Sequence, residues 1–166
     1  MKNLSVVLAT FNEEENLGRC LDSVKDVASE IVIVDGTSKD RTVEIAKEYG
    51  AKVTVTSNPP IFHINKQKAI DKATGDWILQ LDADEVVSKG LQEEIREILD
   101  KNGVENGYWI PRKNYYLGRF LMKGGQYPDY TVRLYRRGKG KLPQKDVHEQ
   151  AVIEGKIDYL KHALLH

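Results

Sequence analysis

The sequence predicts an α/β fold, an α/β/α sandwich with a mostly parallel central sheet and a short antiparallel C-terminal part. Over the first hundred or so residues, short β-branched apolar runs alternate with segments of helical periodicity, which is the order of βαβ units. After Gly103 this alternation stops, and glycines and aromatic residues become frequent. We therefore expect short antiparallel strands and loops to close the open edge of the sheet.

Each expected element is bounded by residues that start or stop regular structure. The predicted parallel strands are residues 4–9, 31–34, 52–56 and 77–81. The predicted helices that alternate with them are residues 12–24, 40–49, 63–73 and 88–103. Asn12 followed by Glu15 is typical of a capping box, Ser88 suits a helix N-cap, and Gly50 and Gly103 suit helix ends. The short strands expected afterwards are residues 107–111, 114–121, 131–135, 151–153 and 157–160.

Length and composition indicate one globular domain. The chain has 166 residues, of which 40% are hydrophobic and 30% charged, and this suits one domain with a real core. The one cysteine, Cys20, lies on an apolar helix face and suits core packing in a reducing compartment. The sequence shows no secretory signal and no apolar run long enough for a membrane span. We therefore expect a cytoplasmic protein.

The neutral net charge conceals a basic second half. Residues 111–145 contain ten Lys and Arg against one acidic residue, Asp129. Such a segment suits phosphate groups or an anionic membrane surface. We expect no nucleic-acid partner, while peripheral contact with the cytoplasmic face of the membrane stays open, as does homodimer formation.

Polar side chains follow several of the predicted parallel strands at their carboxyl ends. In open α/β sheets that edge is where ligands bind. Carboxylates there need a cation or a hydrogen-bonding ligand, because burying them unpaired is costly. A hard ion such as Mg²⁺ or Mn²⁺, shared with substrate phosphates, fits such oxygen ligands. The side chains are Thr10, Asn12 and Glu13 after the first strand, Asp35 after the second, and Asp82 and Asp84 after residues 77–81.

Three other phosphate or metal motifs do not match. A dinucleotide-binding turn needs glycines after the first strand, and residues 9–13 contain none. The chain has no P-loop. A calcium-binding EF-hand loop starting at Asp82 would place Val86 and Val87 where a ligand and a glycine are required.

Three stretches together resemble the family 2 glycosyltransferases, which have the nucleotide-sugar-binding, Rossmann-like GT-A fold. They are residues 10–17 (Thr-Phe-Asn-Glu-Glu-Glu-Asn-Leu), 33–40 (Ile-Val-Asp-Gly-Thr-Ser-Lys-Asp) and 73–85 (Ala-Thr-Gly-Asp-Trp-Ile-Leu-Gln-Leu-Asp-Ala-Asp-Glu). Later stretches, residues 124–129, 133–137 and 147–149, resemble the branch that includes lipopolysaccharide-core glucosyltransferases.

The resemblance implies a single domain, with residues 1–103 as the nucleotide-sugar-binding half and residues 104–166 as the acceptor and catalytic-base half. It implies that Thr10 and Glu13 line the base and ribose pocket and that Asp35 binds the base. Asp82 would reach the ribose or a metal-bound water, and Asp84, the second aspartate of a DxD motif, would bind the metal. Four further residues are implied near the nucleotide sugar, namely Asn12 (unless it only caps its helix), Lys66, Lys68 and Arg133. His148 would position the pyrophosphate or complete the metal shell, unless it is structural.

The implied reaction is metal-dependent, inverting transfer of a hexose-like sugar from a nucleoside diphosphate sugar, with UDP favoured. The acceptor would be a hydroxyl group of a glycan or a lipid-linked molecule. The general base must stand apart from the metal, because a carboxylate neutralised by a cation accepts a proton poorly. Glu149 is the first candidate for this base and Asp129 the second. The alternatives are a nucleotide- or sugar-binding relic without catalysis, and a sugar-phosphate nucleotidyltransferase, which would want a glycine-rich basic loop that is missing.

Overall fold

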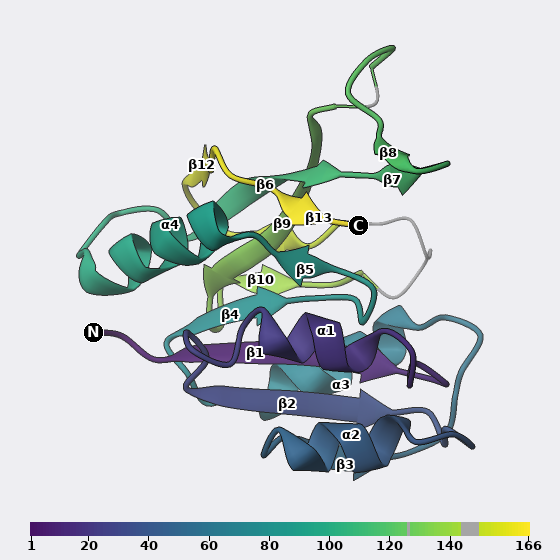
Figure 1. Cartoon of the computed structure of the whole chain (residues 1–166). Helices are drawn as coiled ribbons and strands as arrows, with labels where there is room; N and C mark the ends of the chain where they lie inside the picture. The colour runs from purple at the N-terminus through teal and green to yellow at the C-terminus, as the bar shows by residue number, and fades with distance from the viewer. Residues whose placement is uncertain (126, 144–149) are drawn as a thin grey trace.

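The computed structural model describes residues 1–125, 127–143 and 150–166. Its centre is a nine-stranded sheet flanked by helices (Figure 1). The sheet strands are β1 (Leu4–Thr10), β2 (Glu30–Asp35), β3 (Lys52–Val55), β4 (Trp77–Gln80), β5 (Val86–Val87), β6 (Gly107–Lys113), β9 (Asp129–Arg136), β12 (Ile157–Tyr159) and β13 (Leu164–Leu165). The helices are α1 (Leu17–Asp22), α2 (Thr42–Glu48), α3 (His63–Lys72) and α4 (Lys89–Asp100). Two small hairpins, β7 (Tyr115–Tyr116) with β8 (Arg119–Phe120) and β10 (Gly140–Lys141) with β11 (Val152–Ile153), stand apart from it.

The sheet is parallel in its first half and mixed in its second, so the predicted α/β fold class is confirmed. Its strand order is β3-β2-β1-β4-β9-β6-β13-β5, and β12 also pairs with β6. Strands β1 to β4 are parallel to one another, whereas β9 runs antiparallel to both β4 and β6. Strand β9 thus joins the two halves of the sheet.

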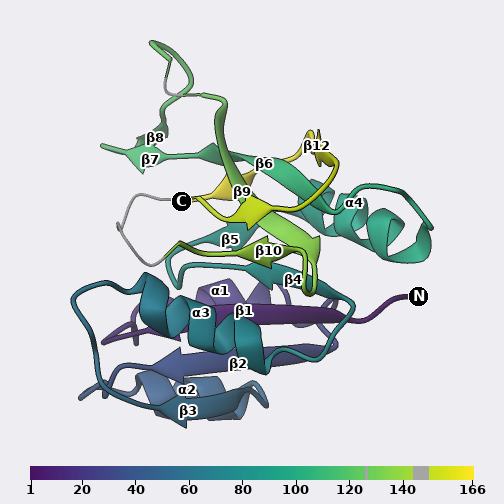
Figure 2. The same ribbon diagram turned by 180° about the vertical axis from the view of Figure 1, so that it is seen from behind.

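Hydrophobic clusters cover both faces of the sheet. Successive residues of β1 alternate between them, because strand side chains point to opposite faces: Val6 and Leu8 enter one cluster and Val7 the other. Helices α1, α2 and α4 cover the first face, and α3 covers the second (Figures 1 and 2). Cys20 of α1 is completely buried in the first cluster, as expected for a packing residue.

The prediction that Asn12 caps the first helix was wrong. Asn12 has a left-handed backbone (φ 53°), and α1 begins only at Leu17. Its side-chain oxygen accepts the backbone N–H of Lys39, and its own backbone N–H donates to Ser38 Oγ. Asn12 therefore ties the loop after β1 to the loop after β2. Ser88, by contrast, caps α4 as predicted, since its hydroxyl accepts the backbone N–H of Leu91.

The predicted strand over residues 114–121 is instead a tight hairpin. Leu117 and Gly118 both have positive φ angles (48° and 81°) between the two-residue strands β7 and β8. Gly118 adopts this angle readily because it has no Cβ. Strands β5 and β13, two residues each, were not predicted at all.

In the described part of the chain, we find no helix with both the length and the apolar character that crossing a membrane requires.

Candidate functional site

The carboxyl ends of β1 and β2 lie side by side and hold the first buried carboxylate. Thr10 is directly opposite Asp35 in the parallel register. Asp35 is fully buried and accepts hydrogen bonds from Thr10 Oγ1 (2.8 Å), from the backbone N–H of Ser38 (2.7 Å) and from Ser38 Oγ (2.6 Å). These bonds satisfy most of the lone pairs of Asp35 from within the chain. They fix Thr10 and the turn after β2.

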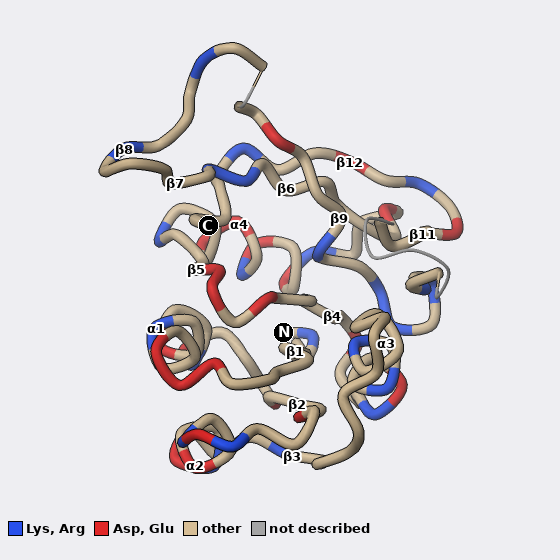
Figure 3. The backbone as a smooth tube through the Cα atoms, turned by 90° about the vertical axis from the view of Figure 1, so that its right-hand side faces the viewer, with Lys and Arg blue, Asp and Glu red and all other residues tan. Residues whose placement is uncertain are grey.

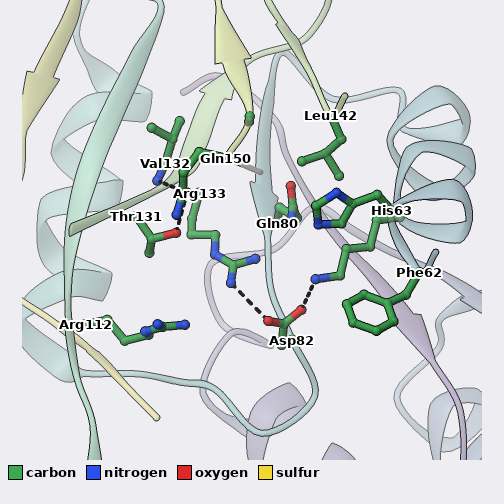
Figure 4. A pocket seen from close by; sticks show the side chains of 12 residues that line it. Phe62, His63, Gln80, Asp82, Arg112, Thr131, Val132, Arg133, Leu142 and Gln150 are labelled. Carbon is green, nitrogen blue, oxygen red and sulfur yellow. Dashed lines mark hydrogen bonds and ion pairs between the residues drawn. The ribbon is translucent and has the colours of Figure 1, made fainter. Parts of the chain in front are cut away.

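Asp82, just beyond the end of β4, lies between two cations from different elements. Lys66 Nζ of α3 is 2.5 Å from Oδ1, and Arg133 Nη2 of β9 is 3.0 Å from Oδ2 (Figure 4). Both cationic side chains are at least nine-tenths buried. Desolvation alone would raise the pKa of Asp82, but the charges of Arg133 and Lys66 outweigh it and hold that pKa well below its usual range.

Glu85 is a second buried carboxylate beneath Asp82, and sequence reasoning gave it no role. Its side chain is fully buried and accepts the backbone N–H of Asp82 (2.9 Å) and Arg133 Nη2 (3.0 Å). Burial raises the pKa of Glu85, although the charge of Arg133 acts in the opposite direction. Glu85 thus closes the turn that carries Asp82. In the sequence, the signal for a buried Glu85 was the apolar pair that follows it, Val86 and Val87.

Asp84 faces the cavity and meets a histidine from the far end of the chain. Its side chain is about half exposed, and its Oδ2 lies 3.2 Å from His166 Nε2. The other ring nitrogen of His166 is 2.9 Å from Asn114 Oδ1. The hydrogen bond with His166 lowers the pKa of Asp84 and raises the pKa of His166. Sequence reasoning did not connect the two residues, because the β6–β13 pairing that brings His166 here has no local signal.

Two adjoining cavities open at this edge of the sheet. The larger has a volume of about 470 Å³, and the smaller of about 200 Å³ lies next to it. They share Phe62, Lys66 and Asp82. The larger is also lined by Thr10, Glu13, Asn58, Asp84 and His166. The smaller is also lined by His63, Gln80, Arg112, Arg133 and Gln150 (Figure 4).

Glu13 is partly desolvated at the wall of the larger cavity. Burial raises the pKa of Glu13, although a hydrogen bond from Asn16 acts the other way. Thr10, which was predicted to line the same pocket as Glu13, also lines this cavity. Asn12 and Lys68 are exposed and line neither cavity.

Of the two predicted catalytic bases, the structure describes only Asp129. Glu149, together with His148, lies outside the described residues. Asp129 lines neither cavity and is bound to Arg112 Nη2 (2.8 Å) and Asn114 Nδ2 (3.1 Å). Desolvation would raise the pKa of Asp129, but the hydrogen bonds from Arg112 and Asn114 outweigh it and lower that pKa. Both assignments therefore stay predictions.

The residues present fit a divalent cation whose coordination a substrate completes. Asp84 offers a half-exposed carboxylate, and His166 Nε2 would become a second ligand by losing the proton that it shares with Asp84 Oδ2. The charge of Asp82 is already compensated. No cluster of three or more His, Cys, Asp or Glu side chains suited to a metal occurs in residues 1–125, 127–143 and 150–166. Mg²⁺ commonly takes only one or two carboxylates and fills its shell with substrate phosphates and water.

The chain belongs to glycosyl transferase family 2, because the model of that family matches residues 5–152. Among curated relatives, LpsC of Rhizobium meliloti, a lipopolysaccharide core biosynthesis glycosyltransferase, is 34% identical over 93% of this chain and 58% of its own length. A protein of Rickettsia typhi named an uncharacterized glycosyltransferase is 31% identical over 96% of this chain and 56% of its own. The chain thus spans little more than half of these relatives.

Solved structures identify the architecture as the GT-A fold. Residues 1–349 of S. aureus TarS, in complex with UDP-GlcNAc, superpose with a TM-score of 0.77 at 21% identity, over 99% of this chain and 58% of that fragment. Glucosyl-3-phosphoglycerate synthase from Mycobacterium tuberculosis, in complex with Mn²⁺, UDP and glucosyl-3-phosphoglycerate, gives a TM-score of 0.52 at 22% identity. That match covers 70% of this chain and 45% of the synthase.

Proposed function

We propose that this chain transfers a hexose-like sugar from a nucleoside diphosphate sugar, with UDP favoured, to a hydroxyl group of a glycan or lipid-linked acceptor. The observation that carries the proposal is the larger cavity at the carboxyl ends of β1 and β4. Its lining combines Glu13 with a nearly buried cation, Lys66, and with the Asp84–His166 pair. A cation and an open carboxylate in one cavity suit a diphosphate and its metal ion.

Different lining residues of the larger cavity would contact different parts of such a donor. Thr10 and Glu13 would contact the base and ribose, and Lys66 would face the phosphates. Asp35 does not line the cavity, so its contacts support a role in holding Thr10, while direct binding of the base stays a prediction. The smaller cavity, of about 200 Å³, lies next to Asp82 and Lys66 and would receive the sugar ring.

Asp84 and His166 would hold Mg²⁺ or Mn²⁺, and Asp82 would orient Lys66 and Arg133 beside it. A bound divalent cation would compensate the charge that develops on a departing nucleoside diphosphate. The Mn²⁺ and UDP bound by the mycobacterial synthase and the UDP-GlcNAc bound by TarS support this donor chemistry. The acceptor hydroxyl would lose its proton to a carboxylate, with Glu149 preferred over Asp129, as the attack inverts the sugar carbon.

Turnover of the donor tests the proposal. UDP, GDP or TDP release from a panel of nucleotide sugars is measured with Mn²⁺, with and without a lipid-glycan extract as acceptor. We expect release from one donor class, and a loss of about 10²–10³-fold in Asp84→Ala, because the open carboxylate of the site is gone.

The matched control is Asp22→Ala, which removes an exposed aspartate that lines neither cavity. Its turnover should stay at the unsubstituted level. Donor binding without any release would favour the non-catalytic relic. If Glu149→Gln turned over normally and Asp129→Asn did not, Asp129 would be the base. Formation of a nucleotide sugar from a sugar phosphate would favour the nucleotidyltransferase.

A further inference from the structure

The β7–β8 hairpin stands outside the main sheet and projects from the molecule. It forms a two-stranded sheet of its own beside the upper end of β6 in Figure 1. A backbone hydrogen bond from Tyr115 N–H to the carbonyl of His166 ties the hairpin to the body, and one from Leu121 N–H to the carbonyl of Asn114 closes its base. Isolated two-stranded hairpins are marginally stable in water. We call residues 113–123 the hairpin segment.

The hairpin segment exposes large apolar side chains at its tip and on both strands. Leu117 at the turn is 84% exposed and Tyr116 is 60% exposed. Tyr115 and Phe120 pack edge to face with ring centroids 5.2 Å apart, yet both remain exposed, as does Met122. Several large exposed apolar side chains on one short segment are typical of an interaction site.

The charged residues in the sequence of the hairpin segment and its immediate flanks are all cationic. Between Tyr108 and Gly125 the sequence has four cationic residues, Arg112, Lys113, Arg119 and Lys123, and no Asp or Glu. Figure 3 shows blue, basic segments at β6, on β8 and on the loop that follows β8. The next acidic residue, Asp129, is already paired with Arg112.

This combination fits an anionic lipid surface better than a protein. Tyrosine and other aromatic side chains are favoured at the membrane–water interface, and clustered Lys and Arg are attracted by anionic headgroups. Protein interfaces, in contrast, are depleted of lysine, and the hairpin segment carries two, Lys113 and Lys123. A protruding apolar tip flanked by exposed Arg119 and Lys123 matches the layered chemistry of a bilayer surface.

The hairpin also adjoins the candidate site. A third cavity, of about 550 Å³, is lined by Tyr115 and Phe120 of the hairpin and by Asp84 and His166, which also line the cavity of about 470 Å³. A molecule anchored in a lipid surface at the hairpin would thus lie next to Asp84 and His166, which also line the larger cavity.

We propose that the hairpin segment docks this protein on an anionic bilayer. Tyr116 and Leu117 enter the headgroup layer, and Lys113, Arg119 and Lys123 lie against lipid phosphates. This docking does not rest on the proposed sugar transfer. It would, however, present a lipid-linked acceptor beside Asp84.

Vesicle flotation tests the docking. The chain is mixed with vesicles of phosphatidylcholine alone or of phosphatidylcholine with phosphatidylglycerol, at low and high salt. We expect binding to the phosphatidylglycerol vesicles, weakened by salt because screening shortens the reach of exposed charges. The double variants Tyr116→Ser/Leu117→Ser and Arg119→Glu/Lys123→Glu should each bind at least about tenfold more weakly.

Matched controls are Lys47→Glu/Lys72→Glu, which reverses two exposed helix charges elsewhere, and Val104→Ser, which removes an exposed apolar side chain far from the hairpin. Both should bind like the unsubstituted chain. Thermal melts confirm that each variant is folded. Failure of the unsubstituted chain to bind phosphatidylglycerol vesicles overturns the proposal, and so does unchanged binding by both hairpin variants. A dimer that Leu117→Ser dissociates, without vesicle binding, would assign the hairpin to a second copy of the chain.

Discussion

Three carboxylates lie within five residues after β4, and their surroundings give them different properties. Asp82 is ionised between Lys66 and Arg133, Glu85 is buried with a raised pKa, and Asp84 is half exposed beside His166. Only Asp84 keeps an oxygen open to the larger cavity without two cations on it. Among these three carboxylates, this environment favours Asp84 as the one that would hold the proposed metal ion.

Asp35 offers a residue-level prediction about stability. Asp35→Ala removes the acceptor of three hydrogen bonds in a fully buried position. The unpaired donors of Thr10 and Ser38 should lower the free energy of unfolding by about 1–3 kcal/mol, measured by urea titration. Asp26→Ala, at an exposed position, should change it by less than about 0.5 kcal/mol. Equal stabilities of the two variants would contradict this account of Asp35.

At the scale of elements, Arg133 connects the two halves of the sheet at the site. It extends from β9 and binds both Asp82 and Glu85 in the turn between β4 and β5. Its side chain is 8% exposed. The same side chain therefore organises the turn that carries the three carboxylates and forms a wall of the smaller cavity.

Replacing Arg133 should destabilise the protein strongly. Arg133→Met leaves Glu85 with only its more distant cation, Arg112, at 3.8 Å. A fully uncompensated buried charge costs about 3–5 kcal/mol of unfolding free energy, so we expect a loss up to that size. Adding Glu85→Gln should recover part of the loss, because it removes that buried charge. A double-mutant cycle in urea measures the coupling, with the exposed Arg41→Met as the control. Additive losses, with no recovery in the double variant, would show that the pair does not act as described.

The elements were predictable where a local pattern determines them. Alternating apolar runs indicated β1 to β4 and all four helices, and Ser88 indicated the start of α4. The left-handed Asn12 and the turn at Leu117 were missed, because the loop after β2 and the hairpin geometry outweigh local propensity. Strands β5 and β13 consist of two residues each, which is too short for any periodicity.

The sequence also predicted that Asp82 and Asp84 end a strand at the ligand-binding edge, but not what surrounds them. Their partners come from α3, β9 and the chain's last residues. Contacts of that kind depend on tertiary packing, which one sequence does not reveal.

At the scale of the whole molecule, the parallel half and the mixed half share one sheet and meet at the site. The parallel half contributes Thr10, Glu13 and Asp84 to the lining of the larger cavity, and the mixed half contributes His166. The hairpin segment stands beside this opening. The arrangement suits a protein that holds a soluble donor in one half and receives its acceptor through the other.

The most direct test of the central claim is a thermal-shift panel of UDP, GDP and TDP, each with Mn²⁺, Mg²⁺ or EDTA. A ligand at about 100 times its Kd stabilises the folded state by about 2.7 kcal/mol, or about 5–10 °C for a domain of this size. We predict such a shift with one diphosphate, only with metal, lost in Asp84→Ala and kept in Asp22→Ala. A folded protein that no diphosphate shifts at millimolar concentration with either metal would contradict the claim.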